Sequence, residues 1–63
     1  MDELIRQAWV DAHKIAIIEH GEEMGIENFE IAEFCWQELD KLEREDKFFT
    51  VYFRLLEERG LKQ

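Results

Sequence analysis

Several residue types are scarce or absent in this sequence of 63 residues, and each absence excludes something. The single cysteine, Cys35, excludes an internal disulfide and a zinc-binding thiol cluster, which favours a reducing, intracellular setting. Serine is absent and Thr50 is the only threonine, so no hydroxyl nucleophile is evident. The chain has no proline, three glycines, few β-branched residues and no Asn-Gly or Asp-Gly hairpin signal. We therefore expect an all-α protein without a glycine-rich phosphate loop.

Positive charge is also scarce. The sequence has eight Lys and Arg and sixteen Asp and Glu, which gives a net charge of −8. Neutralising phosphates requires clustered cations, so nucleic acid is not expected as a general partner. No apolar run approaches the roughly 18 residues of a membrane span. The acidic N-terminus, residues 1–5, lacks the basic region of a secretory signal. We therefore expect a cytoplasmic protein with no membrane partner.

Length and hydrophobic content predict a single helical domain over residues 1–63. Hydrophobic residues make up 46% of the chain, which is typical of a globular rather than a disordered sequence. A chain this short covers its apolar surface only marginally. Self-association is therefore expected to contribute to its stability.

Apolar residues at spacings of three and four predict helices over 2–23, 28–44 and 47–59. Asn28 and Asp46 are expected to cap the second and third helices. Gly25 and Gly60, each followed by an aliphatic residue, are expected to end the first and third. The predicted architecture is a three-helix bundle. Its predicted core consists of Trp9, Ala12, Ile15, Ala32, Trp36, Leu39, Phe49, Phe53 and Leu56.

The alternative architecture is a long helical hairpin that dimerises into a four-helix bundle. Positions 32, 35, 39, 42, 46, 49, 53 and 56 follow a near-heptad spacing, interrupted only by Asp46. No glycine or proline between Glu43 and Lys47 compels a break. A continuous helix over 28–59 would be about 48 Å long and would leave most of this seam uncovered without a second copy.

The segment 48–56 is the densest apolar stretch, since seven of its nine residues are apolar or aromatic. On a helical wheel these residues cover roughly 200°, whereas a surface helix needs little more than about 100°. The surplus has to be buried by a central position in the bundle, by a second copy or by a foreign partner. The sequence predicts a homodimer interface made of Phe48, Phe49, Tyr52, Phe53 and Leu56.

No catalytic, cofactor or metal site is predicted, and the residues that could bind a metal are expected to have structural roles. His13 and His20 are seven residues apart, which places them on one helix face but about 10 Å apart, too far to share an ion. Both are expected to be partly exposed beside a second apolar strip, Val10 and Ile17. Cys35 is expected to be a small buried hydrophobe.

An acidic group at Glu19, Glu22 and Glu23 resembles the clustered glutamates of magnesium-dependent all-α nucleotide pyrophosphohydrolases. That resemblance implies a metal-dependent enzyme, but it also requires a second acidic cluster at fixed helical spacing. The predicted role of these carboxylates is therefore a solvated face, with no metal and no enzymatic activity.

The end of the third predicted helix, LLEERGLK over residues 55–62, resembles the recognition helix of winged-helix regulators of the multiple-antibiotic-resistance repressor type. The tripeptide TVY at 50–52 is similar to ferric-uptake-type regulators. The resemblance implies a truncated winged-helix, DNA-binding transcriptional regulator. This helix offers apolar residues where base recognition needs Arg, Asn or Gln, and its ending is also typical of an ordinary helix C-cap.

The acidity remains as a functional signal. A small acidic helical protein can imitate the charge of DNA and occupy a basic cleft of another protein. Alternatively, the charge can simply keep a bundle with exposed apolar surface in solution. The sequence predicts a non-enzymatic protein-interaction module, a regulator or inhibitor of a basic partner, that self-associates through its C-terminal helix.

Overall fold

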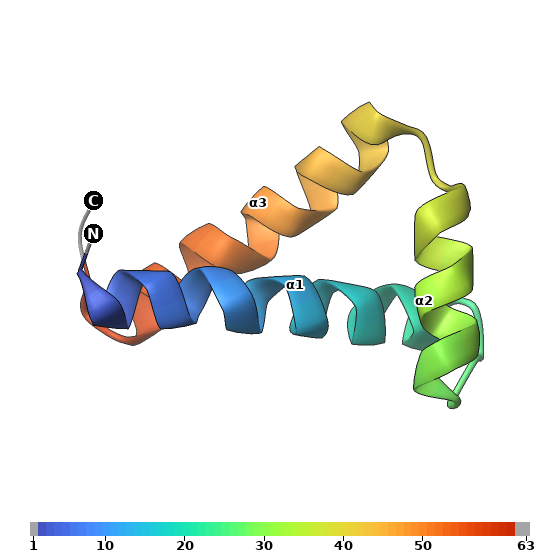
Figure 1. Cartoon of the computed structure of the whole chain (residues 1–63), viewed down its shortest axis with the longest axis horizontal. Helices are drawn as coiled ribbons and strands as arrows, with labels where there is room; N and C mark the ends of the chain where they lie inside the picture. Colours follow the sequence, from blue (N-terminus) through green and yellow to red (C-terminus); the bar gives the residue numbers. More distant parts are fainter. Residues whose placement is uncertain (1, 62–63) are drawn as a thin grey trace.

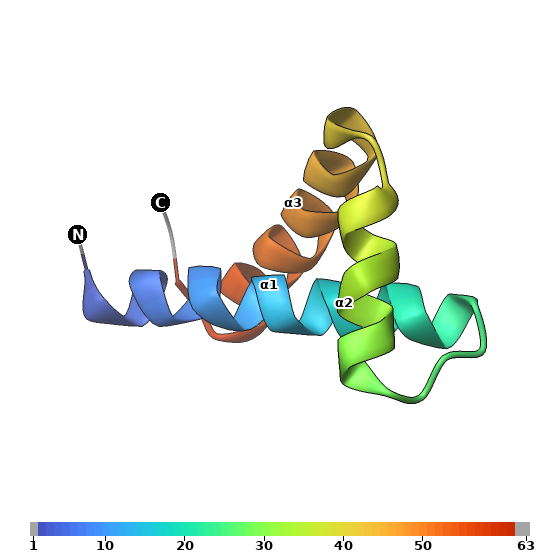
Figure 2. The ribbon, with the colours of Figure 1, turned by 45° about the vertical axis from the view of Figure 1, so that its right-hand side comes forward.

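The computed structural model describes residues 2–61, and these form three helices (Figure 1). They are α1 (Glu3–Glu23), α2 (Phe29–Glu38) and α3 (Lys41–Glu58), with no strand in this part of the chain. The helix α1 contacts both of the others. Figure 2 shows α2 crossing α1 near its C-terminal end, while α3 returns along α1 (Figure 1). The predicted all-α, three-helix architecture is confirmed.

An acidic or amide side chain caps the N-terminus of each helix. The side chains of Asp2, Asn28 and Asp40 accept the backbone N–H of Leu4, Ile31 and Glu43, at 2.8, 3.1 and 3.0 Å. These contacts satisfy N–H groups that have no partner within the helix. Asn28 therefore has its predicted role.

The second break in the chain lies earlier than the sequence predicted. Helix α2 ends at Glu38 rather than Arg44, and α3 begins at Lys41 rather than Lys47, with Asp40 in place of Asp46 as its cap. The alternative prediction of one continuous helix over 28–59 is therefore wrong. The guanidinium of Arg44 explains part of the turn, because it donates to the backbone carbonyls of Gln37 and Leu39 and so satisfies the end of α2.

Two glycines end α1 and α3 as predicted. Gly25 and Gly60 have φ angles of 74° and 68°, the left-handed conformation that side chains disfavour. The residue after each glycine donates its N–H back to the helix, from Ile26 to the Gly21 carbonyl at 2.8 Å and from Leu61 to the Leu56 carbonyl at 2.8 Å.

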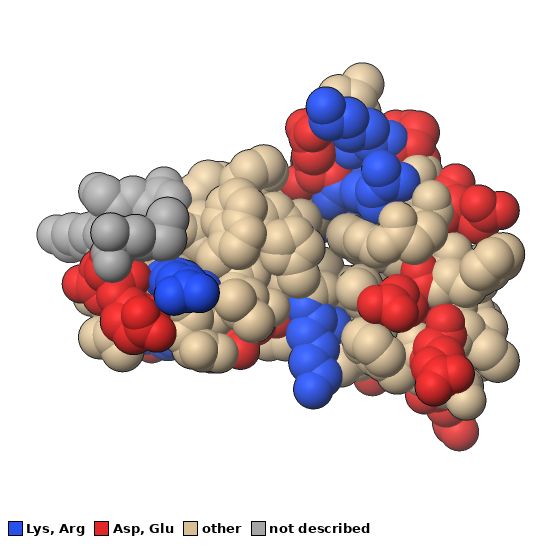
Figure 3. Space-filling view, in the orientation of Figure 1, with Lys and Arg blue, Asp and Glu red and all other residues tan. Residues whose placement is uncertain are grey.

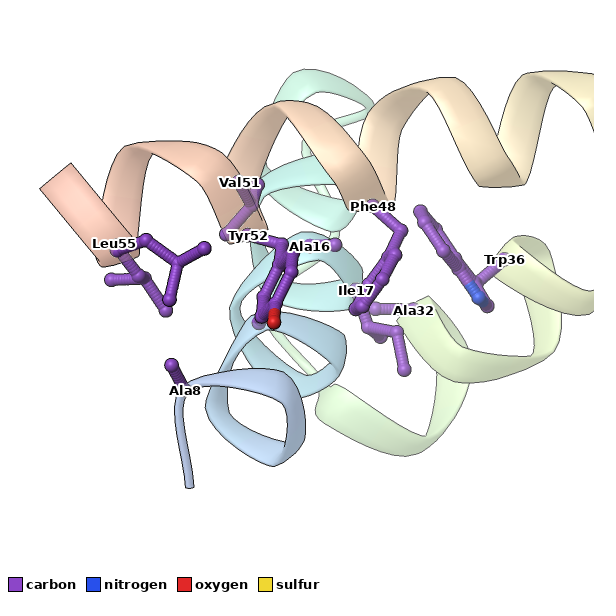
Figure 4. Close-up of a cluster of buried hydrophobic side chains, with 11 residues drawn as sticks. Ala8, Ala16, Ile17, Ala32, Trp36, Phe48, Val51, Tyr52 and Leu55 are labelled. Carbon is purple, nitrogen blue, oxygen red and sulfur yellow. The ribbon is translucent and has the colours of Figure 1, made fainter. Parts of the chain in front are cut away.

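The core lies on two different faces of α1. Ala8, Ala12 and Ala16 form a buried ridge of small side chains, spaced four residues apart, on one face. Figure 4 shows Val51, Tyr52 and Leu55 of α3 pointing toward the part of α1 that carries Ala8 and Ala16. Small side chains let two helices approach closely, so the larger α3 side chains fill the space between them.

The second core face of α1 meets α2. Ile17, His20 and Gly21 are buried there, together with Ala32 and Trp36 of α2. A Cβ atom placed on Gly21 would lie 2.7 Å from the Cβ of Ala32, so the two backbones are in close approach at this crossing.

The predicted core is correct in part. Ala12, Ala32, Trp36 and Leu56 are buried, while Ile15 and Leu39 are partly buried against the core. The prediction is wrong for Trp9, Phe49 and Phe53, which are 40%, 36% and 52% exposed. For Phe49 and Phe53 the reason is the rotation of α3, which turns Phe48, Val51, Tyr52 and Leu55 inward instead, and on α1 it is Ala8 rather than Trp9 that faces α3 directly.

The predictions for the opposite strip of α1 are also partly wrong. Ile17 and His20 are buried because α2 covers the C-terminal half of this strip. Val10 and His13, nearer the N-terminus of α1, remain exposed. Cys35 is half-buried rather than fully buried.

Candidate functional site

The five residues predicted to form an interface divide into two groups. Phe48, Tyr52 and Leu56 are buried within a single subunit, so they are not available on its surface. Phe49 and Phe53 are exposed on α3. The surplus of apolar surface inferred from the sequence is therefore smaller than predicted, and it lies at two of the five positions.

An aromatic face, which we define as Trp9, Phe49 and Phe53, joins these two rings to α1. The ring centroids of Phe49 and Phe53 are 5.7 Å apart, and those of Trp9 and Phe49 are 6.0 Å apart. Trp9 also contacts the buried rings of Phe48 and Tyr52 edge-on, with ring centroids 4.7 and 5.1 Å away. Such contacts hold the rings in fixed orientations. Figure 3 shows an area over α1 and the C-terminal half of α3 with no Lys, Arg, Asp or Glu.

A pocket of about 530 Å³ lies beside the aromatic face, where the three helices meet. Trp9, Trp36, Phe48 and Phe49 form its apolar walls, and the polar side chains that line it are His13, Lys41, Arg44 and Glu45. We call this the aromatic pocket. An apolar cavity with a few charged groups at its mouth is the usual form of a binding site, and this volume lies in the usual range.

Two cations of α3 and its C-cap residue Arg59 pair with carboxylates on α1. Arg54 donates to Glu19 at 2.6 Å and Arg59 donates to Asp11 at 2.9 Å, while Lys47 lies 3.4 Å from Glu23. The amide of Gln7 and the guanidinium of Arg59 donate to Asp11 and lower its pKa, and the hydrogen bond to Glu19 raises the pKa of Arg54. These pairs fasten α3 along α1.

The predicted acidic group does not come together as a metal site. Glu19 and Glu23 pair with cations of α3, and no group of three or more potential ligands is placed to hold a metal ion within residues 2–61. His20 is only 7% exposed, and its ring lies 6.1 Å from the ring of Trp36. Its Nδ1 is buried without a hydrogen-bond partner in the described part of the chain.

The negative charge is concentrated at one end of the molecule. Between Ile15 and Asp40 the sequence has eight carboxylates and no Lys or Arg, whereas the rest of the chain has eight of each sign. The net charge of −8 is therefore carried by the C-terminal part of α1, by α2 and by the connections on either side of α2. Figure 3 shows red side chains gathered at the α2 end of the molecule.

The outward side of α2 carries an exposed ring between two carboxylates. Phe34 is 67% exposed, and Glu30 and Glu38 are each four residues away on the same side of the helix. We call these three residues the α2 stripe. Phe34 was in neither the predicted core nor the predicted interface, so sequence reasoning missed this feature. The signal in the sequence was the pair of glutamates, Glu30 and Glu38, one helical turn before and after Phe34.

Comparison with known protein families, with curated proteins and with solved structures found no match for this chain. Over residues 2–61, no helix combines the length and the apolar character needed to cross a membrane.

Proposed function

We propose that this chain is a small, acidic, non-enzymatic protein-interaction module that self-associates through its aromatic face. The observation that carries the proposal is the exposure of Trp9, Phe49 and Phe53 as one cluster of rings. Clustered, rigid aromatic side chains are the residues that most often dominate protein–protein binding. Three partly exposed rings present on the order of 250 Å² of apolar surface, which would form the centre of an interface of about 800 Å² per partner.

A second part of the proposal concerns the acidic end of the molecule. Of the eight carboxylates between Ile15 and Asp40, Glu19 and Glu23 pair with cations of α3, and the other six form no ion pair with a described residue, which supports a surface complementary to a basic protein. We propose that the module regulates or inhibits a partner with such a surface.

The competing role as a DNA-binding regulator receives no support from α3. Arg54 of α3 and Arg59, its C-cap residue, pair with Glu19 and Asp11 on α1, so neither is left unpaired for a phosphate.

Replacing Phe53 with aspartate is expected to abolish self-association without unfolding the subunit. Phe53 is 52% exposed, so a carboxylate there is solvated in the monomer but would be buried in the dimer. Sedimentation equilibrium over a range of concentrations is the measurement, with circular dichroism to check the fold.

Lys14→Gln is the matched control, because it makes the same change in net charge at an exposed position of α1 outside the aromatic face. The control is expected to remain associated. A Phe53→Asp protein that sediments as the wild type does would show that the aromatic face is not the interface.

A further inference from the structure

We infer that the acidic end of the molecule binds a lysine- or arginine-rich amphipathic segment of its basic partner, with an apolar side chain of that segment entering a cavity between α1 and α2. The inference rests on the second part of the proposed function, a partner with a basic surface. It names where that partner binds and which kind of segment fits.

The cavity lies where the C-terminal part of α1, the connection over 24–28 and the start of α2 come together, and we call it the end pocket. Figure 2 shows this connection looping around the end of the molecule from α1 to α2. The end pocket has a volume of about 800 Å³, and its apolar lining consists of Ile18, Ile26, Phe29 and Ala32. Ile18 and Phe29 are 39% and 37% exposed, so apolar surface is already accessible there. A cavity of this volume and lining is suited to bury an apolar group of a partner.

Three charged side chains also line the end pocket, and they are Lys14, Glu22 and Glu27. All three are exposed, and none of them forms an ion pair with any other described residue. Lys14 and Glu22 are eight residues apart on α1, which is about 12 Å along the helix axis, so they lie toward opposite edges of the pocket. The two carboxylates outnumber Lys14, and the charge of the pocket therefore favours a cation over an anion.

Glu22 lies in an electrostatically unfavourable position in the isolated subunit. It belongs to the last turn of α1, where the helix end carries a partial negative charge. Its neighbour Glu23 lies 3.4 Å from the ammonium group of Lys47, whereas Glu22 forms no ion pair with a described residue. An ammonium or guanidinium group of another protein would face both this carboxylate and the helix end. The position of Glu22 therefore points to a cation independently of the number of carboxylates nearby.

The surroundings favour a basic amphipathic segment over other occupants. No Lys or Arg occurs between Ile15 and Asp40, and six of the eight carboxylates there form no ion pair with a described residue. A second copy of this chain, with a net charge of −8, would bring charge of the same sign to the pocket, which is costly. A purely cationic segment would leave the apolar lining in contact with water. An amphipathic segment satisfies both the lining and the carboxylates.

The end pocket is separate from the aromatic face, because its lining includes none of Trp9, Phe49 and Phe53. One chain therefore offers one surface to a second copy and another surface to a basic partner. The two interactions can be tested independently of each other.

Peptides of defined chemistry test the inference. The main probe is a fluorescein-labelled peptide of about 15 residues, long enough to form a helix, with leucine on one face and lysine on the other. The comparison probes are the same peptide with glutamate in place of lysine and an oligolysine of the same length. Fluorescence anisotropy, with the protein titrated into each probe, gives the dissociation constants. The leucine–lysine peptide is expected to bind at least about tenfold more tightly than either comparison probe.

Two double variants with the same net charge locate the binding site. Glu22→Gln combined with Glu27→Gln removes both carboxylates of the end pocket, and its control, Glu30→Gln combined with Glu38→Gln, removes those of the α2 stripe. The first is expected to weaken binding of the leucine–lysine peptide by about fivefold or more, and the second by about twofold or less. Lys14→Gln is expected to strengthen binding, because it removes a cation that opposes the peptide.

A truncation that leaves the charge unchanged tests the apolar lining. Ile18→Ala is expected to weaken binding of the leucine–lysine peptide by about fivefold, since it removes apolar surface that the entering side chain would cover. Val10→Ala is the control, because it shortens an exposed aliphatic side chain of the same helix outside the end pocket. Circular dichroism identifies any variant that fails to fold, and Phe29→Ala then replaces Ile18→Ala.

The outcomes separate this inference from the proposed function. Equal losses for the two double variants would mean that the acidic end attracts the peptide as a whole, which overturns the end pocket as the site but leaves the basic partner in place. The inference also fails if Ile18→Ala binds as the wild type does, or if either comparison probe binds as tightly as the leucine–lysine peptide. A wild-type protein that binds neither lysine-containing peptide contradicts both the inference and the basic partner. Self-association is tested apart from these, because Phe53→Asp is expected to bind the leucine–lysine peptide as the wild type does.

Discussion

Replacing Trp36 with alanine is expected to destabilise the fold by roughly 3–5 kcal/mol, the usual range for removing a large buried aromatic side chain. Trp36 is 5% exposed, and apart from Ala32 it is the only fully buried residue of α2. A domain of this size has a total stability of roughly 3–9 kcal/mol. The substitution therefore removes most of what holds α2 in place, and partial or complete unfolding is the expected result.

Urea denaturation followed by far-ultraviolet circular dichroism measures the effect. Phe34→Ala is the matched control, because it removes an aromatic ring from the same helix at a position that is 67% exposed. It is expected to change the free energy of unfolding of the monomer by less than about 0.5 kcal/mol. Equal losses for the two variants would contradict the packing described for α2.

Replacing Gly21 with alanine is the second large effect, and its sign is opposite to that expected from helix propensity. Alanine in the middle of a helix is normally about 1 kcal/mol better than glycine. Here the added Cβ would lie 2.7 Å from the Cβ of Ala32 and 3.2 Å from the carbonyl oxygen of Ile26. Both neighbours are held by helix or turn backbone, so the overlap has to push α2 away from α1. We expect a net loss of about 1–3 kcal/mol.

A compensating substitution tests the cause. Gly21→Ala combined with Ala32→Gly moves the methyl group from α2 to α1 and reopens the crossing. The double variant is expected to be more stable than Gly21→Ala alone, although a glycine inside α2 limits the recovery by about 1 kcal/mol. Thermal melts of the three proteins give the comparison. A double variant that is less stable than the single one would show that the loss does not arise from this contact.

Much of the fold could be predicted because its signals are local. Asn28, Gly25 and Gly60 act at the helix ends they were assigned, since a cap depends on a few neighbouring residues. The break at Leu39–Asp40 was missed for a different reason. Beside the local cap at Asp40 it depends on Arg44, which reaches back to the carbonyls of Gln37 and Leu39, and such a contact is not visible in the spacing of apolar residues.

Which apolar residues face inward was harder to predict. The segment 48–56 is apolar over such a wide arc that periodicity does not fix the rotation of α3, and the buried set became Phe48, Val51, Tyr52, Leu55 and Leu56. On α1 the difficulty was the crossing of α2, which buries Ile17 and His20 but does not reach Val10. A helix with two neighbours at different angles has two buried faces, and a single-stripe interpretation finds only one of them.

The candidate site was predicted only in part. Phe49 and Phe53 were predicted as interface residues because a surplus of aromatic residues is visible in the sequence, and the structure shows both exposed on α3. The aromatic pocket could not be predicted, since its walls come from three helices and depend on where α2 ends.

The three glycines of this chain serve two different physical needs, and chirality distinguishes them. At Gly25 and Gly60 an added methyl group would meet nothing within 4 Å, so only the handedness of the backbone excludes an L-residue there. A synthetic chain with D-alanine at these two positions is expected to be more stable than the natural one, because the mirror-image residue prefers the required φ and restricts the unfolded chain. Thermal melting would show the gain. At Gly21 the constraint is space rather than handedness, so an extra methyl group has no comparable room there.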